Sequence, residues 1–552
     1  MRYLPVFAIF FSVAGCSKKE ASTPVQPPVT ESFSLQSVTI NSVALSVTLY
    51  GVALQPQLKL TFSAPVKRST ASTILLNAAT GGSIAHDLSF QDNDNVVLLQ
   101  PSSPLSPLTK YNLAISSSVQ SAKGNSLANG SNVSFVTAID SSDKFPRLTD
   151  TALVQLVQQQ SFNYFWDFGH PVSGLARERN TSGDLVTSGG SGFGVMAIIT
   201  GIHRGFITRA QGLARLQIMV AFLKNTAQRF HGAYPHWLNG VTGVVIPFSA
   251  KDNGADLVET SYLIQGLLCA RQYFDGANPA EAFLRSEINA IADGVEWSWF
   301  RKNNENVLYW HWSPNFNWDM NMQIKGWNES LITYVLAASS TAHSIPKIVY
   351  DAGWASNGVM RNGAIYYSYQ LPLGPNLGGP LFFSHYSFLG INPFGLTDGY
   401  ANYQTQVVNH TKINYSYCVA NPNNYYGYSD QCWGLTASDI PNGYGASSPT
   451  NDLGVIAPTA ALSSFPYTPT ESMKALKFFY YKLGDKLWGQ YGPKDAFKLS
   501  DPWFANSYLA IDQGPIVVMM ENYRSGLLWS LFMSCPEVKT GMRSLGFQSP
   551  HL

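Results

Sequence analysis

Charged residues are unusually scarce in this sequence. Only 12% of its 552 residues are Asp, Glu, Lys or Arg, against roughly 25% in a typical soluble domain. The formal net charge is +1, which argues against a nucleic-acid partner and against a membrane surface held by charge. In contrast, the chain holds 13 Trp, 28 Tyr and 31 Phe. Low charge combined with many aromatic residues is typical of exported proteins that bind neutral polar ligands.

Beyond the N-terminus the sequence has no apolar run long enough to cross a bilayer. Residues 4–13 are apolar but too short to span, follow Arg2, and end in Val13-Ala14-Gly15-Cys16, which resembles a bacterial lipobox. We therefore expect residues 1–16 to be a lipoprotein signal with Cys16 lipidated; a plain secretory signal is the alternative. Ser17, in place of Asp, favours the outer membrane, on its periplasmic or surface face.

Residues 17–32 are rich in Ser, Thr, Pro and Lys and predict a flexible tether. The membrane would then be reached through the lipid alone.

Cysteine is also scarce. Four cysteines remain after Cys16, and none forms a CxxC or Cys/His metal-binding spacing. The histidines are scattered too, so we expect neither a metal nor a cofactor. Cys418 and Cys432 lie in loop-like sequence and could pair in an oxidising compartment, whereas Cys269 lies in an apolar helical stretch.

Tryptophan is absent before Trp166, and this divides the chain. Residues 33–140 contain short alternating runs separated by Gly, Pro, Asn and Ser, a pattern that predicts a small Ig-like β-sandwich. The runs are residues 58–62, 73–76, 96–99, 111–115 and 134–137.

Residues 150–548 follow a helical period instead. Apolar residues step by three and four over 213–223 and over 473–487, as amphipathic helices require. Long loops rich in Gly, Asn, Tyr and Trp separate the helices. We predict a mainly α domain in which helical hairpins form a toroid and their loops meet at one mouth.

Three acidic sites stand out against the low charge. Asp252, Asp256 and Glu259 are spaced four and three, which would place them on one face of a helix; helix capping is the alternative explanation. Glu329 follows a loop dense in Trp and His, and Asn328 before it predicts a helix cap. The alternative is an acid that only balances the helix dipole.

The third acid, Asp512, precedes Gly514-Pro515, which predicts a helix start. The helix dipole would hold Asp512 ionised, as a catalytic base requires; a structural role is the alternative.

Residues 189–194 are glycine-rich without a preceding strand and predict close packing, not a nucleotide site. For residues 177–179, pocket lining and a structural ion pair remain equally open.

Several carboxylates among aromatic loops suit a sugar, whose edges bind carboxylates and amides and whose faces stack on aromatic rings. Hydrolysis of a glycosidic bond needs two carboxyl groups. Motifs for rival chemistries are missing: the sequence has no GxSxG elbow, no HExxH and no P-loop.

Residues 150–548 resemble the bacterial glucoamylase-like domain of glycoside hydrolase family 144. The resemblance is carried by nine ordered segments: residues 174–179, 187–194, 230–240, 251–260, 326–330, 384–388, 433–439, 457–461 and 512–529. It implies an (α/α)6 toroid acting on β-1,2-glucan or sophoro-oligosaccharides as an inverting hydrolase, either cutting internally or releasing sophorose from a chain end. We expect a monomer.

On this resemblance Glu329 is the expected general acid and Asp512 the preferred base, with Asp256 as the alternative. The expected substrate-binding residues are Asp252, Glu259, Trp237, His236, Trp327, His385, Tyr386 and Trp433. The sandwich could crowd one end of the cleft, which leaves internal versus terminal cutting open. Two other hypotheses are a hydrolase or transglycosylase acting on another glucan, and a non-catalytic surface glycan-binding lipoprotein.

Overall fold

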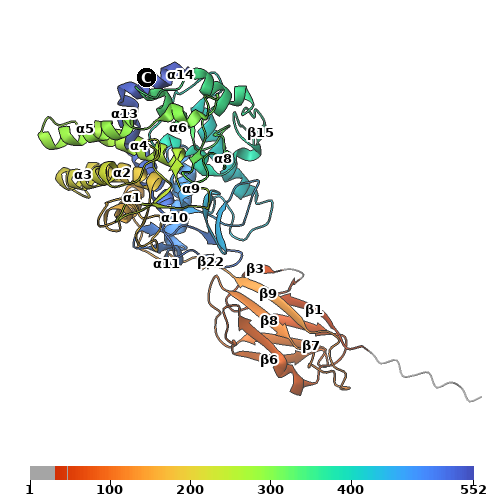
Figure 1. Ribbon diagram of the computed structural model, residues 1–552. Coiled ribbons are helices and arrows are strands. Elements are labelled where there is room, and N and C mark those ends of the chain that lie inside the picture. The colour runs from red at the N-terminus through yellow and green to blue at the C-terminus, as the bar shows by residue number, and fades with distance from the viewer. Residues whose placement is uncertain (1–31, 46–47) are drawn as a thin grey trace, which may run out of the picture.

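The computed structural model describes residues 32–45 and 48–552, which form a β-sandwich followed by a larger helical domain (Figure 1). The predicted signal, Cys16 and the predicted tether up to residue 31 lie outside the described residues. Among the residues that are described, no helix has the length and apolarity needed to span a membrane.

The sandwich consists of two sheets. Five strands run in the order β2-β1-β4-β7-β6, and four run in the order β3-β9-β8-β5. Alternation along β4 explains the packing, because Leu58, Leu60 and Phe62 are buried while Lys59 is exposed. All five predicted strand segments are confirmed. The strands are β1 Leu35–Ile40, β2 Val43–Ala44, β3 Leu49–Val52, β4 Leu58–Phe62, β5 Ile74–Ala78, β6 His86–Gln91, β7 Val96–Pro101, β8 Lys110–Ile115 and β9 Ser131–Thr137.

The helical domain is a ring of inner helices surrounded by outer ones. Its helices are α1 Asp150–Trp166, α2 Ser188–His203, α3 Arg209–Asn225, α4 Leu257–Tyr273, α5 Pro279–Asp293, α6 Leu331–Ser339, α7 Lys347–Val349, α8 Tyr403–Ala420, α9 Pro458–Leu462, α10 Pro469–Tyr481, α11 Gly484–Leu487, α12 Ala510–Ser525, α13 Leu527–Ser534 and α14 Pro536–Leu545.

The inner ring follows from which helices touch. Helix α2 packs between α4 and α12, α6 packs on α4, and α9 packs on α12. Two 3-10 turns, Leu381–Ser384 and Ser387–Leu389, take the sixth inner position between α6 and α9. This is the predicted (α/α)6 toroid.

One short three-stranded sheet, β10-β11-β12, and five two-stranded ones lie in the described loops of the toroid. Their strands are β10 Leu185–Thr187, β11 Trp237–Asn239, β12 Val245–Ile246, β13 Ala255–Asp256, β14 His311–Trp312, β15 Ile365–Tyr366, β16 Tyr369–Gln370, β17 Ala437–Ile440, β18 Gly443–Ala446, β19 Trp488–Gly489, β20 Gly492–Pro493, β21 Phe497–Lys498 and β22 Trp503–Phe504.

Glycine allows the two central inner helices to approach closely. A Cβ on Gly192 of α2 would lie 2.1 Å from the Tyr262 carbonyl oxygen, and a Cβ on Gly266 of α4 would lie 2.2 Å from the Gly192 carbonyl oxygen. Backbone therefore meets backbone across this interface, and the glycine-rich segment 189–194 serves close packing as predicted. The expectation that no strand precedes this segment is wrong, because β10 ends at Thr187 and α2 begins at Ser188.

One expectation about local structure is wrong, and one open question is answered. The pattern over residues 473–487 covers two helices, because the chain turns between Tyr481 and Gly484 and starts α11. Cys418 and Cys432 are both free and fully buried in the apolar core, so no disulfide joins them.

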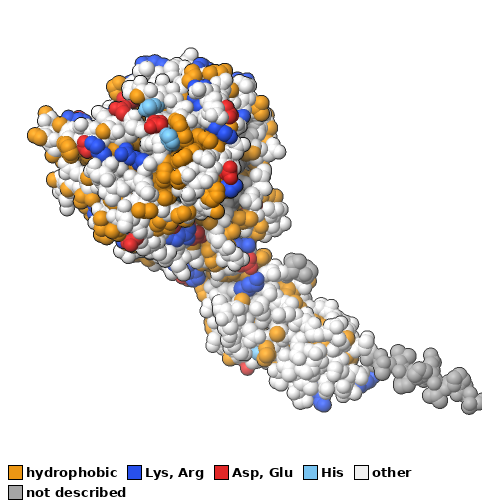
Figure 2. All heavy atoms as spheres, viewed as in Figure 1, with side chains coloured by type: hydrophobic (Ala, Val, Ile, Leu, Met, Phe, Trp, Pro, Cys, Tyr) orange, Lys and Arg blue, Asp and Glu red, His pale blue; other side chains and the backbone are white. Residues whose placement is uncertain are grey.

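The sandwich is tied to the helical domain by polar and apolar contacts. The Lys110 ammonium lies 3.0 Å from the Asp501 carboxylate, and Tyr50 of β3 stacks on Tyr426 with ring centroids 5.3 Å apart. Leu108 is buried among apolar side chains of the helical domain. Figure 2 shows basic and acidic side chains side by side at this junction.

Candidate active site

The N-terminal ends of four inner helices converge on one cavity. Helices α2, α4, α6 and α12 all begin beside it. Because the N-terminal end of a helix is electropositive, this convergence favours carboxylates there. The acidic residues noted in the sequence accordingly gather at these helix starts.

The cavity encloses about 450 Å³ and is walled largely by aromatic rings. It is lined by Glu178, Arg179, Thr187, His236, Trp237, Phe248, Glu259, Tyr262, Trp310, Glu329, Phe382, Tyr386, Ala437, Tyr444, Ala446, Leu509 and Ile511. Every lining residue belongs to the helical domain, so the sandwich does not wall this cavity.

Glu329 is one of three acids that line this cavity, with Glu178 and Glu259. Helix α6 begins at Leu331, so the expectation that Asn328 caps the helix with Glu329 in its first turn is wrong. Instead the Asn328 side chain accepts a hydrogen bond from the Ser330 amide, closing a turn ahead of the helix. Burial raises the pKa of Glu329 to about 7, and the nearby Glu259 and Asp256 carboxylates add to the rise. Glu329 therefore keeps a proton near neutral pH.

The acidic cluster does not occupy one helical face, as its spacing predicted. Asp256 caps α4, accepting hydrogen bonds from the Val258 and Glu259 amides at 3.0 and 2.9 Å. Glu259, in the first turn, accepts one from the Gly189 amide at 2.9 Å. Asp252 lies in the loop before β13. The capping explanation is thus correct for Asp256, and Glu259 lines the cavity.

Two histidines balance the charge of this cluster. His236 Nδ1 lies 3.3 Å from Asp256 Oδ2, and His311 Nε2 lies 3.4 Å from Asp252 Oδ2. Burial lowers the pKa of His236, but Glu259 and Asp256 outweigh it and raise the pKa to about 9. Burial also opposes ionisation of Asp256, yet the two neighbouring histidines, 3.3 and 3.6 Å from its Oδ2, hold its pKa well below the usual range. A carboxylate so stabilised is a poor proton acceptor.

The same cluster has the composition of a cation site. Donor atoms of His236, Asp252 and Asp256 lie within 4.8 Å of one another. However, these groups already pair as ions of opposite sign, together with His311. The cluster is therefore charge-compensated by its own histidines.

Asp512 lies in the first turn of α12, is buried, and directly follows the lining residue Ile511. Within the described residues neither of its carboxyl oxygens has a hydrogen-bond partner. Burial, and then the neighbouring Asp495, raise the pKa of Asp512 well above its usual value. The expectation that the helix dipole keeps Asp512 ionised is therefore wrong for the free protein.

Asp495 completes a carboxyl pair. Burial raises its pKa to about 7, and it accepts a hydrogen bond from the Asp439 amide at 2.7 Å. Two adjacent buried carboxyl groups do not both ionise readily, so the pair keeps one proton and one negative charge. Such a pair can still accept a proton from water.

Tyr386 lies near both Asp512 of the carboxyl pair and Glu329. Burial raises the pKa of its hydroxyl, and the carboxyl groups of both Asp512 and Glu329 add to the rise. Its ring centroid lies 5.7 Å from that of Tyr262, which lines the same cavity. Both carboxyl groups are thus near enough to act electrostatically on the Tyr386 hydroxyl.

Among the expected substrate-binding residues, Glu259, His236, Trp237 and Tyr386 line the cavity, and Asp252 lies behind His311. His236 and Trp237 pack on Phe248, with ring centroids 4.3 and 4.8 Å apart. Together these three rings form an aromatic wall at the cavity.

Three expected binding residues are structural instead. Trp433 is fully buried and donates its indole N–H to the Glu471 carbonyl oxygen. Trp327 is 4% exposed and packs on Trp354. His385 is 1% exposed, bonds the Ser464 hydroxyl at 3.0 Å, and has a pKa lowered to about 3 by burial. The low pKa keeps His385 neutral, and its burial keeps it out of the cavity lining.

Sequence reasoning missed several lining residues. Glu178 and Arg179, whose role the sequence left open, line the cavity, and Arg179 also pairs with Glu178 and Asp439. Both alternatives, pocket lining and a structural ion pair, therefore apply to them. Arg177 instead bonds backbone carbonyls of Gly183 and Phe168 and is structural. Trp310 belongs to the Trp-rich loop and could have been found there. Four other lining residues carry no local signal: Phe248, Tyr262, Phe382 and Tyr444. Asp495, the carboxyl partner of Asp512, was missed as well.

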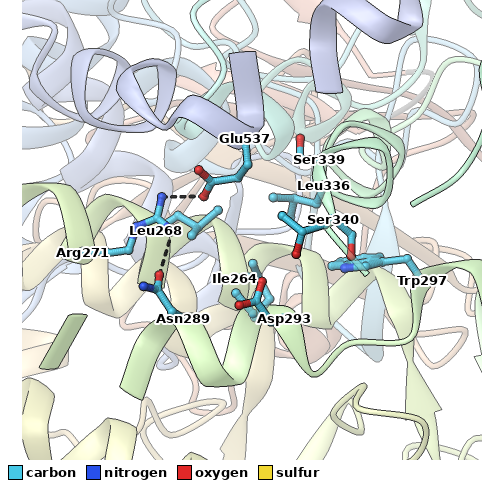
Figure 3. A pocket seen from close by; sticks show the side chains of 12 residues that line it. Ile264, Leu268, Arg271, Asn289, Asp293, Trp297, Leu336, Ser339, Ser340 and Glu537 are labelled. Carbon is cyan, nitrogen blue, oxygen red and sulfur yellow. Dashed lines mark hydrogen bonds and ion pairs between the residues drawn. The ribbon is translucent and has the colours of Figure 1, made fainter. Parts of the chain in front are cut away.

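A second crevice lies near the other ends of the same helices (Figure 3). It encloses about 220 Å³, and its Arg271 is already bonded to Glu537 and Asn289. Of its two acids, Glu537 is paired with Arg271 and Asp293 stands apart from any second carboxylate in the lining, and Trp297 is its single aromatic lining residue, so it does not compete as an active site.

Comparison with known proteins agrees with this geometry. Residues 321–536 match the family model described as "Putative glucoamylase", and residues 30–137 match that of the bacterial Ig-like domain. The chain is 46% identical over 421 residues to an exo β-1,2-glucooligosaccharide sophorohydrolase (non-reducing end) from Parabacteroides distasonis. That match covers 72% of this chain but only 58% of the relative.

Two solved structures are also similar. The endo-β-1,2-glucanase from Chitinophaga pinensis, in complex with sophorotriose and glucose, is 54% identical, with a TM-score of 0.72, and is matched over 74% of this chain and 100% of its own. The β-1,2-glucanase from Parabacteroides distasonis is 37% identical, with a TM-score of 0.71, over 93% of this chain and 73% of its own.

A toroid of helices that gathers carboxyl groups and aromatic rings around one cavity defines a glycoside hydrolase, and the protein is such an enzyme. The chain belongs to the bacterial glucoamylase-like family, glycoside hydrolase family 144, and carries an Ig-like domain in front of the catalytic domain.

Proposed function

We propose that the enzyme hydrolyses β-1,2-glucan to sophorose or short sophoro-oligosaccharides with inversion at the anomeric carbon. The names of its relatives support this substrate. The single observation that carries the proposal is Glu329, which keeps its proton to about pH 7 inside a cavity walled by rings. That is the protonation state a general acid needs.

In the proposed reaction, Glu329 protonates the glycosidic oxygen as the bond to the leaving sugar breaks. A water molecule attacks the anomeric carbon from the opposite face, and the Asp495–Asp512 pair takes its proton. Inverting enzymes hold acid and base roughly 6.5–9.5 Å apart to admit that water. The His236–Asp256 ion pair and the aromatic wall would hold and orient the sugar rings.

The experiment is to incubate the purified protein with linear β-1,2-glucan and follow products by size and by proton NMR. We expect the α-anomer to appear first, because inversion of a β-linkage gives it directly. A β-anomer formed first would overturn the inverting mechanism. Products from another glucan, with none from β-1,2-glucan, would overturn the substrate. Early products of mixed length would indicate internal cuts, and sophorose alone would indicate release from a chain end.

We further propose that the enzyme is held in the cell envelope by lipid on Cys16, which the Val13–Cys16 motif supports. Cys16→Ser is expected to move the protein from the membrane fraction to the soluble fraction of the same cells. Equal membrane association of both forms would contradict the anchor.

A further inference from the structure

A second hollow, of about 550 Å³, adjoins the main cavity. The two spaces share Arg179 and Tyr444 as lining residues. The hairpin of β17 and β18 contributes side chains to both. A polymer that leaves the main cavity past Tyr444 therefore enters this hollow next.

The lining of the hollow suits a sugar ring. Trp503 and Phe504 of β22 are partly exposed there, and the Tyr444 side chain is 50% exposed. Aromatic faces of this kind cover the C–H face of a sugar. The charged groups of the hollow, Arg179 and Asp439, are paired with each other. The lining of the hollow therefore offers aromatic and polar groups, and its two opposite charges compensate each other, so it suits a neutral ligand.

Several hydrogen-bonding groups in the hollow have no protein partner. Among the described residues, the Tyr444 hydroxyl, the Trp503 indole N–H, the Thr181 hydroxyl and the Asn506 amide N–H₂ make no hydrogen bond. These donors and acceptors lie around the exposed aromatic rings, which is the arrangement that a ring bearing several hydroxyls requires.

The segment that carries Trp503 is already ordered. Strand β22 pairs with β21, and Phe504 stacks on Phe497 with centroids 5.8 Å apart. Between the strands, Asp501 is held by Lys498 and by Lys110 of the sandwich. Figure 1 places β22 at the edge of the helical domain next to the sandwich. A preformed site of this kind binds with little ordering cost.

We propose that this hollow is a distal subsite that binds a glucosyl unit of the substrate outside the main cavity, with Trp503 stacking on the ring. The proposal rests on the proposed function and adds a preference for longer chains. It also gives the sandwich a role: it supports the hairpin that carries the subsite, without touching the main cavity.

The test compares native enzyme and Trp503→Ala on β-1,2-linked gluco-oligosaccharides of increasing length. For native enzyme, kcat/KM should rise when the chain becomes long enough to fill the hollow. Trp503→Ala should remove that rise, a loss of about five- to tenfold on long chains, and should leave the shortest cleaved substrate unchanged. Trp503→Phe keeps a flat ring and should retain most of the rise.

An equal loss at every length would overturn the subsite, as would no loss at any length. Melting temperatures of the variants control for damage to the fold.

If native enzyme cleaves no β-1,2-linked chain, the proposed function fails, and calorimetric binding of the same chains decides on the subsite. A Trp503-dependent gain in affinity with length would still support the subsite, and no such gain would overturn it.

Discussion

Glu329→Gln is expected to reduce kcat by at least about a thousandfold, because an amide cannot deliver a proton to the leaving oxygen. Gln has almost the shape of Glu, so KM and the fold should change little. Glu471→Gln on α10, away from the cavity, is the matched control and should keep native rates. Near-native turnover by Glu329→Gln would contradict the role of Glu329 as acid.

The pH dependence separates catalysis from stability at Glu329. Since its pKa is raised to about 7 from 4.5, native activity that needs the protonated acid should fall as pH rises through 7. The stability linked to this group is present below pH 4.5 and is lost as pH rises through about 7. Glu329→Gln lacks this loss, so at pH 8 it should melt at or above the native temperature. A lower melting temperature at pH 8 would indicate structural damage instead.

Asp512→Asn is expected to lower kcat by about a thousandfold with little change in KM, because the remaining Asp495 alone is bonded to the Asp439 amide and set back from the cavity. Asp256→Asn should act differently. Asn can keep the cap of α4, because it caps helices as well as Asp does, but the substitution removes the ion pair with His236. It should therefore raise KM and lower the melting temperature through the lost ion pair.

Measured kcat, KM and melting curves distinguish the two carboxylates. The control is Asp485→Asn on α11, a partly exposed residue paired only with Lys486. If Asp256→Asn abolished kcat while Asp512→Asn kept it, the base would be Asp256. The first choice made from the sequence would then be wrong.

The fold was largely predictable because it depends on periodic patterns. Alternation predicted β4, β5, β7, β8 and β9, and the three-and-four steps predicted α3 and α10. The same reasoning failed at Leu483, where a continued pattern hides a turn. Periodicity reports which face is buried, and it carries no information on whether the backbone is continuous.

Asp256, Glu259, Glu329 and Asp512 stood out in the sequence because charge is rare here and each lies at or just before a helix start. For aromatic residues and histidines, the sequence did not distinguish those that line the cavity from those that are buried in the core. Trp237 and Trp433 occur in equally aromatic segments, yet one lines the cavity and the other is fully buried. Asp495 was missed because its partner Asp512 lies on a different element, and the contact between them exists only in the folded chain.

The junction between the two domains has a practical consequence for shortened chains. Removing residues up to 140 would uncover Tyr426 and the apolar surface that now receives Leu108, and would leave Asp501 without its lysine from the sandwich. Freshly exposed apolar patches promote self-association. The catalytic domain produced alone would therefore be prone to aggregate, and its solubility depends on a domain that takes no part in the chemistry.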